Sequence, residues 1–378
     1  MLTQTPPDTG LETAADEVRQ LAAHRAPEAD RSGALDPEVV RAVRRAGFGR
    51  HFVARHLGGA EGTFAALTRA VSTVGEGCAA TAWCASLAAY SSRFASLLPP
   101  QGHEELWGRD PDTLVATGLV PSGRAEASGD DWSLSGSWGY VSGIDDADWA
   151  LVCAPVADPA SGTAPAAGPP ETRFFALPRG SYQVTPTWDA TGMRATGSHT
   201  LTVQDARVPA HLSFSRRAML SGHNAHSTVP AHNVPFQAVG GLTFIAPALG
   251  AAVGCLAAGA AALGARRRTQ AAELALVRAS GRIDAARHLV AQNAEVIDDR
   301  HFTPELMARN ERNATFAAEL LQEAVGLVVR ASGTGGLAQG RPVERFWRDV
   351  TTATSHIALQ YDTAARKNYS AVLAGPES

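Results

Sequence analysis

The sequence has few cysteines, and they are not spaced for a metal site. Its four cysteines are scattered without a Cys-x-x-Cys pair, which argues against a zinc site and against a disulfide framework. We expect small buried thiols in a reducing compartment. The first residues lack the basic start and apolar core of a secretory signal, so a cytoplasmic protein is predicted. The cysteines are Cys78, Cys84, Cys153 and Cys255.

The sequence also lacks an excess of positive charge. The formal net charge is −4, and the only basic cluster is the short run Arg266–Arg268, so nucleic acid is not expected as a partner. A membrane is not expected either. The uncharged segment Phe244–Ala265 is long enough to span one, but it is mostly Ala and Gly, which gain little in hydrocarbon. We predict that it forms a central helix, closely packed by its neighbours.

No Gly-x-Gly-x-x-Gly follows a strand, so a dinucleotide-binding domain is not predicted. Apolar residues first recur at helical spacing, then alternate with polar ones, and then return to helical spacing. This order excludes a doubly wound parallel sheet. The chain has 378 residues, 45% of them hydrophobic, which is enough for several packed units. We predict a helical domain over 1–112, a small β-barrel over 113–215 and a helical bundle over 216–378.

A strand pattern ending at Ser142 carries two aromatic residues at period two. Trp138, Tyr140 and Ser142 would therefore share one face of the strand. Such a face can offer an aromatic wall and a hydroxyl group to a planar ligand. The alternative is that the aromatic residues fill the barrel core and the serine belongs to a turn.

The stretch Arg345–Leu359 places a histidine near the end of the chain. On a continuous helix, Arg345, Asp349, Thr352 and His356 would share one face. His356 is then expected inside the protein, where something must satisfy its ring nitrogens. Two interpretations remain open. One is a hydrogen-bonded structural histidine, and the other is a general base beside a cofactor.

Two further groups of residues have an ordinary structural interpretation. Trp83 and Tyr90 lie seven residues apart, on one face of a helix in the first domain, and such residues are most often core. Three histidines lie between Arg216 and Phe236, but neither their spacing nor a nearby carboxylate supports a metal site. An exposed or pocket-lining loop is predicted instead. The three are His223, His226 and His232.

Several motifs, taken in order, resemble the acyl-CoA dehydrogenase fold. GTGGLAQGRPVERFWRD, Gly333–Asp349, resembles that superfamily's glycine turn and the Arg-Asp segment after it. GMRATGSHTLTVQDARVP, Gly192–Pro209, is similar to the strand pair that closes its middle domain. The resemblance covers almost the whole chain. It implies an α+β, mostly α protein with an N-terminal helical domain, a middle small β-barrel and a C-terminal four-helix bundle.

Within that superfamily, the chain resembles a branch that is not made of dehydrogenases. α,β-Dehydrogenation needs a carboxylate base, but the position that often carries it is Ile357, and Gly240–Ala265 has no carboxylate. TAWCASL, SGSWGYVSG and a histidine seven residues after Arg-Asp instead resemble the two-component flavin-dependent monooxygenases, or group D hydroxylases. One departure is Ser91, which stands where several of those hydroxylases have a second histidine.

The resemblance implies roles for individual residues. Ser142 would hydrogen-bond near flavin N5 and C4a, Trp138 would pack by the flavin ring, and His356 would face the substrate as the base. Ser142 and His356 are the expected catalytic residues. The other expected cofactor residues are Tyr140, Gly143, Arg266, Gly335 and Gly336, with Arg266 reaching a neighbouring subunit's flavin. The expected substrate residues beside His356 are Trp83, Tyr90 and Ser91.

The resemblance also implies an activity. Reduced FMN or FAD would come from a separate NAD(P)H:flavin reductase, because no nicotinamide site is visible, and O2 would be the co-substrate. A flavin C4a-hydroperoxide would insert one oxygen atom into a phenolic or polyketide-like aromatic, in secondary metabolism or catabolism. A homotetramer is expected. The alternatives are N-oxygenation of an amine or amino sugar, and an acyl-CoA dehydrogenase-like protein with displaced or lost chemistry.

Overall fold

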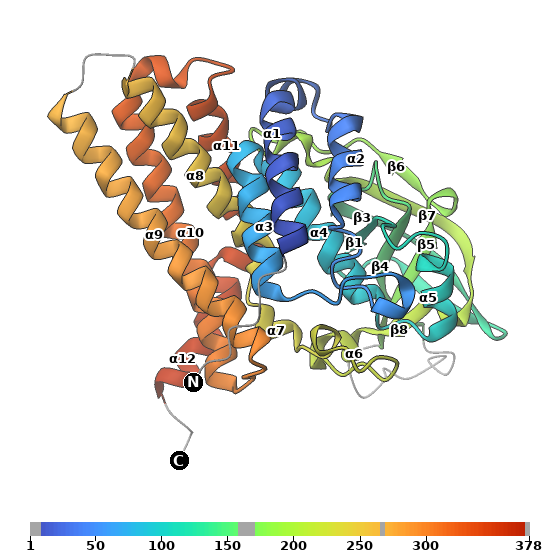
Figure 1. Cartoon of the computed structure of the whole chain (residues 1–378). Coiled ribbons are helices and arrows are strands. Elements are labelled where there is room, and N and C mark those ends of the chain that lie inside the picture. The colour runs from blue at the N-terminus through green and yellow to red at the C-terminus, as the bar shows by residue number, and fades with distance from the viewer. Residues whose placement is uncertain (1–8, 158–170, 265–268, 375–378) are drawn as a thin grey trace.

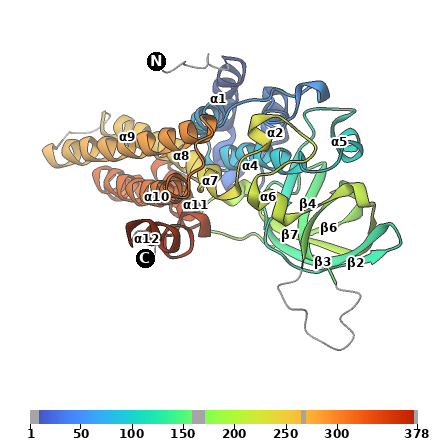
Figure 2. The ribbon, with the colours of Figure 1, turned by 90° about the horizontal axis from the view of Figure 1, so that it is seen from below.

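The computed structural model describes residues 9–157, 171–264 and 269–374. Within these ranges the chain has eight strands, and helices come before and after them (Figure 1). Seen from below, the strands gather on one side of the molecule, with α8, α9 and α10 on the other (Figure 2). The predicted α+β, mostly α fold is confirmed. The first helices are α1 (Thr9–Ser32), α2 (Pro37–Ala46), α3 (Phe64–Gly77), α4 (Ala79–Ala95) and α5 (Pro100–Trp107).

The strands form two four-stranded sheets, in the orders β1-β4-β5-β8 and β2-β3-β7-β6. The β1–β4 pair is parallel, and the other pairs are antiparallel. A separate cluster of buried apolar side chains, including Leu134, Leu151 and Phe175, fills this domain. The strands are β1 (Val115–Gly118), β2 (Arg124–Ser128), β3 (Asp131–Val141), β4 (Trp149–Pro155), β5 (Thr172–Pro178), β6 (Gln183–Thr185), β7 (His199–Val208) and β8 (Ser213–Ser215).

The last part of the chain is helical. Its four longest helices, α8 to α11, pack on one another. One buried apolar cluster runs from α3 and α4 into these helices, so the first and last parts of the chain share a core. The helices are α6 (Arg216–Ser221), α7 (Phe236–Val239), α8 (Leu242–Gly264), α9 (Gln270–Asp298), α10 (Pro304–Ser332), α11 (Pro342–Thr354) and α12 (Arg366–Ala374).

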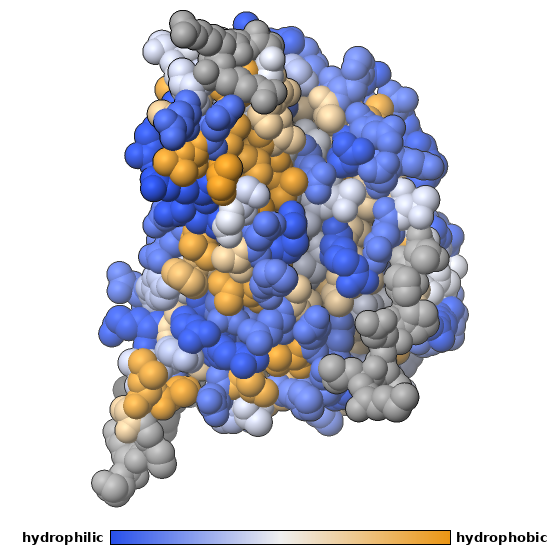
Figure 3. Space-filling model, turned by 60° about the vertical axis from the view of Figure 1, so that its left-hand side comes forward, coloured by the Kyte–Doolittle hydropathy of each residue, from blue (hydrophilic) through white to orange (hydrophobic). Residues whose placement is uncertain are grey.

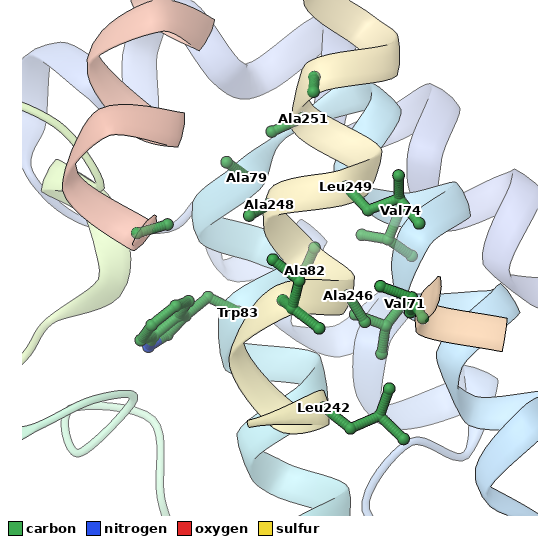
Figure 4. Packing of buried hydrophobic residues seen from close by; sticks show 14 of the residues in the cluster. Val71, Val74, Ala79, Ala82, Trp83, Leu242, Ala246, Ala248, Leu249 and Ala251 are labelled. Carbon is green, nitrogen blue, oxygen red and sulfur yellow. The ribbon is translucent and has the colours of Figure 1, made fainter. Parts of the chain in front are cut away.

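Helix α8 is the centre of that shared core, and its small residues allow close helix crossings. An added Cβ on Gly250 would lie 2.0 Å from the Ser72 carbonyl oxygen of α3, so only glycine fits there. Figure 4 shows the Ala, Val and Leu side chains of α3, α4 and α8 packed together. The segment Phe236–Gly264 is long and apolar enough to cross a membrane, yet 61% of its apolar window is buried inside the protein. This agrees with the predicted central helix.

Helix α11 ends two residues before His356, so the predicted continuous helix through His356 is wrong. The cause is the run of threonines and serine at its end. The hydroxyl groups of Thr351, Thr354 and Ser355 donate to carbonyls four residues earlier, at 2.7, 2.7 and 2.8 Å, and such bonds compete with the helix. His356 instead begins a 3₁₀ turn, Ile357–Leu359. Ile357, the first residue of this turn, is 65% exposed.

Candidate active site

Side chains from four separate elements meet beside the barrel. Trp83 comes from α4, Ser142 follows β3, Phe244 lies in the first turn of α8, and His356 follows α11. Trp83 Nε1 donates to Ser142 Oγ at 3.1 Å. The ring centroids of Trp83 and His356 lie 5.8 Å apart, edge-on, and those of Phe244 and His356 lie 3.8 Å apart, stacked. Figure 4 shows Trp83 pointing away from the packed side chains of α3 and α8.

The site is reachable from solvent. Trp83 is buried, but Ser142, Gly143, Phe244 and His356 are each only partly buried. Sequence reasoning singled out Trp83, Ser142, Gly143 and His356, and the structure places them together. It missed Phe244, because one aromatic residue at the start of an apolar helix gives no signal beyond core packing.

The His356 ring is held in one orientation and one tautomer. Its Nδ1 accepts a hydrogen bond from the Ala358 backbone N–H at 3.2 Å, and Phe244 stacks on its face. Burial lowers the pKa of His356 to about 4, so the ring is neutral at pH 7. Since Nδ1 accepts, the proton of the neutral ring lies on Nε2, which makes Nε2 a donor. The base predicted at this position is therefore, in its resting form, a hydrogen-bond donor.

Ser142 lies at the end of a chain of hydroxyl groups. Its Oγ is 2.7 Å from Ser198 Oγ, which is 2.7 Å from Thr196 Oγ1. Thr196 Oγ1 in turn donates to the Met193 carbonyl oxygen at 3.0 Å. The Gly143 N–H donates to the Thr196 carbonyl at 2.7 Å, which ties the turn after β3 to this segment. Neither Thr196 nor Ser198 was predicted to belong to the site, although both lie in a motif used to assign the fold.

A β-bulge separates the three residues that were predicted to share a strand face. Trp138 pairs with Leu201 and Val141 with His199, so Gly139 and Tyr140 together face Thr200. Tyr140 has φ +60° and is 80% exposed. Trp138 points into the barrel, where its Nε1 donates to the Cys153 carbonyl at 2.7 Å. The predicted shared face is wrong, because the bulge shifts the alternation by one residue, and the predicted contact of Trp138 with a cofactor remains an expectation.

Tyr90 and Ser91 do not line the site in the predicted way. The Tyr90 ring is buried against Phe52 and Phe64, with centroids 5.6 and 6.0 Å away. Ser91 is fully buried, and its Oγ accepts from Thr117 Oγ1 of β1 at 2.8 Å. Both side chains serve the packing of α4, Tyr90 against the first helices and Ser91 against the barrel.

The other predicted cofactor residues lie elsewhere or outside the described residues. Gly335 and Gly336 lie in a 3₁₀ turn, Thr334–Leu337, before α11, whereas His356 follows the other end of that helix. Gly336 is buried, and an added Cβ would lie 2.3 Å from the Ser332 side chain. Arg266 falls outside the described residues, so its predicted role remains an expectation.

Of the three histidines before α7, His232 has both ring nitrogens hydrogen-bonded within the protein. His232 is buried, its Nε2 donates to the Phe52 carbonyl at 2.5 Å, and its Nδ1 lies 2.7 Å from Ser227 Oγ. It therefore anchors the connector between α6 and α7 rather than lining an open loop. Within the three described ranges, no group of three or more His, Cys, Asp or Glu side chains is placed to hold a metal ion. All four cysteines are free thiols.

Asp349 holds the turn at Met193, at the inner end of the hydroxyl chain. It is buried on α11, and its Oδ1 accepts the Met193 backbone N–H at 2.6 Å, which fixes the turn whose carbonyl ends the hydroxyl chain. Burial raises the pKa of the Asp349 carboxyl from 3.8 to about 6, against the opposing effects of the Met193 hydrogen bond and Arg345. This hydrogen bond assigns the Asp349 carboxylate to Met193.

Asp349 should make stability depend on pH. Because its pKa is higher in the folded protein, the fold favours the protonated acid, and this stabilisation is lost as the pH rises from about 4 to about 6. Asp349→Asn is neutral at every pH and keeps an acceptor for Met193. We expect the free energy of unfolding of the wild type to fall relative to the variant by up to about 3 kcal/mol across that window. Denaturant titrations at pH 4, 5, 6 and 7 measure the difference, and a constant difference would contradict the assignment.

The residues around Ser142 suit a flavin ring. A flavin has a polar edge that needs hydrogen-bond partners and an apolar face that needs aromatic or aliphatic contact. Ser142 supplies a hydroxyl group at the open side of the site, and Gly143, at φ +71°, brings backbone close without a side chain. Tyr140 and Trp188, with centroids 6.2 Å apart, add aromatic surface at the same bulge.

This chain is similar in sequence to known proteins. Residues 242–361 match the family model of the acyl-CoA dehydrogenase C-terminal domain. The oxygenase subunit HsaA of a flavin-dependent monooxygenase from Rhodococcus jostii is 27% identical over 352 residues, covering 88% of this chain and 90% of that protein. The oxygenase component of an FADH2-dependent resorcinol hydroxylase from Rhizobium sp. is 27% identical over 385 residues, covering 95% of this chain and 93% of that protein.

A solved structure agrees over almost the whole chain. XiaF from Streptomyces sp., in complex with FADH2 and glycerol, superposes with a TM-score of 0.89 at 25% identity, covering 98% of this chain and 96% of that one. The fold and the site thus define a protein of the acyl-CoA dehydrogenase superfamily. Within it, the chain belongs to the flavin-dependent monooxygenases, as an oxygenase component of the two-component kind.

Proposed function

We propose that this chain hydroxylates a phenolic aromatic molecule, inserting one atom of O2 with reduced FMN or FAD that a separate reductase supplies. The observation that carries the proposal is the meeting of Trp83, Ser142 and His356 at a partly open site. Its aromatic walls, Trp83 and Phe244, suit a flat apolar substrate. Among the relatives, the resorcinol hydroxylase is named for a phenol.

The chain's own residues have separate tasks in this proposal. A bound reduced flavin supplies two electrons and activates O2. Ser142, with Gly143, contacts the flavin, and the stacked pair Phe244 and His356 excludes water and orients the substrate. The substrate binds as the phenolate, its proton having passed to solvent, and His356 donates its Nε2–H in a hydrogen bond to the anionic oxygen, which holds the ring in place for attack.

The residues do not favour dehydrogenation. The position that often carries a dehydrogenase's base is Ile357, whose side chain is exposed. The neighbouring buried carboxylate, Asp349, is engaged by the Met193 N–H. A proton next to a thioester carbonyl would therefore have no carboxylate acceptor here.

A substrate panel tests the proposal. The purified chain would receive reduced FMN or FAD, with O2, from an unrelated flavin reductase and NADH. The panel contains monocyclic phenols, polycyclic polyketide-like phenols, an indole and an amino sugar. We expect hydroxylated product from at least one phenol class. Product from the amino sugar alone would replace C-hydroxylation by N-oxygenation, and peroxide alone from every compound would contradict the proposal. NADH oxidation without the reductase would contradict the two-component arrangement.

We further propose that the active form is a homotetramer in the cytoplasm. Apolar side chains lie exposed on the outer helices, including Leu274 and Val277 of α9 and Phe316 of α10, which are 47, 68 and 44% exposed. Figure 3 shows apolar patches on this helical side of the molecule. Covering them with further copies would remove apolar surface from water. Light scattering on the purified chain measures the mass, and a monomer at micromolar concentration would contradict the tetramer.

A further inference from the structure

The hydroxyl groups of Ser142, Ser198 and Thr196 form a hydrogen-bonded chain that ends at the Met193 carbonyl. That carbonyl determines which hydroxyl group donates in each hydrogen bond. The Thr196 Oγ1 lies 3.0 Å from that carbonyl oxygen, and a carbonyl has no proton to give. Thr196 must therefore donate its hydroxyl proton to the Met193 carbonyl, because otherwise the two oxygens would face each other with lone pairs only. The same carbonyl also accepts from Trp188 Nε1 at 2.9 Å and from the Thr196 backbone N–H at 3.2 Å. Neither of those protons can occupy the contact with Thr196 Oγ1.

The Thr196 donation also determines the donors in the next two hydrogen bonds, up to Ser142. Each hydroxyl group has one proton. Because Thr196 gives its proton to Met193, the 2.7 Å contact between Ser198 and Thr196 needs the proton of Ser198. The 2.7 Å contact between Ser142 and Ser198 then needs the proton of Ser142. Trp83 Nε1–H donates to the same Ser142 oxygen. Ser142 therefore donates its only proton to Ser198, and toward a ligand it can act only as a hydrogen-bond acceptor.

Burial keeps this arrangement from rearranging with water. Thr196 and Ser198 are 2% and 6% exposed, whereas Ser142 is only partly buried. The inner two hydroxyl groups thus lie in the protein interior, where an unmade hydrogen bond is costly. The last hydroxyl group faces the open side of the site.

We propose that Thr196 and Ser198 are positioning residues that hold Ser142 as a hydrogen-bond acceptor, so that the site favours reduced over oxidised flavin. Reduction turns N5 of the flavin ring from a lone-pair acceptor into an N–H donor. An acceptor-only Ser142 bonds to an N–H, but it meets an unprotonated ring nitrogen with lone pair against lone pair. The inference rests on the proposed function, because it requires flavin to contact Ser142.

The test is the ratio of two dissociation constants, for oxidised FMN and for anaerobic reduced FMN, measured by fluorescence titration. In Thr196→Val, Ser198 loses its acceptor and can donate to Ser142, whose own proton becomes free to turn toward the flavin. Ser198→Ala frees that proton directly. In both variants we expect the oxidised-to-reduced ratio to fall roughly tenfold. Thr196→Ser keeps every hydroxyl group and should keep the wild-type ratio.

The controls separate positioning from simple loss of packing. Thr202→Val alters a threonine on β7 whose hydroxyl lies 3.4 Å from exposed Ser137, so its ratio should not change. Circular dichroism melts establish that each variant is folded. If Thr196→Val and Ser198→Ala weaken both flavins equally, or if Thr196→Ser shifts the ratio as strongly as Thr196→Val, the inference is overturned while the proposed function stands. If the wild type fails to bind reduced flavin, both are overturned.

Discussion

Replacing His356 with alanine is expected to lower kcat for the phenolic substrate roughly 100-fold while leaving the dissociation constant of reduced flavin nearly unchanged. The imidazole donates through Nε2 and is fixed by the Ala358 N–H and by the Phe244 ring. Alanine removes the donor and leaves the anionic oxygen of the bound phenolate without a partner. Steady-state kinetics with a saturating reductase, together with anaerobic flavin titration, measure the two quantities.

His356→Gln distinguishes a donor from a base. Glutamine can donate through its amide but cannot take up a proton. If His356 acts as a donor, His356→Gln should retain at least about a tenth of the wild-type kcat. Because the pKa of His356 is lowered to about 4, the rate should also show no titration of this group between pH 6 and 8. If His356→Gln and His356→Ala have equally low kcat values, the donor role is contradicted and the general-base role predicted from the sequence is supported.

Ser142→Ala is expected to lower product formation by a similar factor of roughly 100, but in a different way. The variant should still consume reduced flavin and O2, and release hydrogen peroxide in place of product. The change removes the acceptor at the open side of the site and leaves Trp83 Nε1–H and Ser198 without their partner. Product and peroxide formed per flavin oxidised would be measured together.

Ser137→Ala is the matched control for this prediction. Ser137 lies on the same strand, β3, but its hydroxyl faces Thr202 on the exposed side. Its ratio of product to flavin oxidised should equal that of the wild type. A Ser142→Ala variant that couples flavin oxidation to product as well as Ser137→Ala does would remove Ser142 from the catalytic residues.

Much of the fold followed from local patterns. Spacing of apolar residues separated the helices from the strands, and the small residues of Phe244–Ala265 predicted a packed helix, which became α8. Alternation predicted strands between residues 113 and 215, but it could not give the bounds of β6 and β8, because three residues carry too little alternation. Trp83, Ser142 and His356 were each singled out before the structure brought them together.

What failed depended on contacts between distant segments or on competing local bonds. The bulge at Tyr140 exists only because Thr200 of β7 faces two residues of β3, and a single strand pattern cannot reveal it. The end of α11 came from hydroxyl groups that bond to the helix's own carbonyls, which helical spacing ignores. Phe244 and Ser198 belong to the site through contacts with segments far away in the sequence.

The most direct test of the central claim is isotope incorporation from ¹⁸O2. The wild-type chain, supplied with reduced flavin by a separate reductase, would be incubated with the best phenol of the panel, and the product analysed by mass spectrometry. The expected product carries one ¹⁸O atom, and the label disappears from it in H2¹⁸O with unlabelled O2. An unlabelled product, or one that has lost two hydrogens without gaining oxygen, would contradict a monooxygenase.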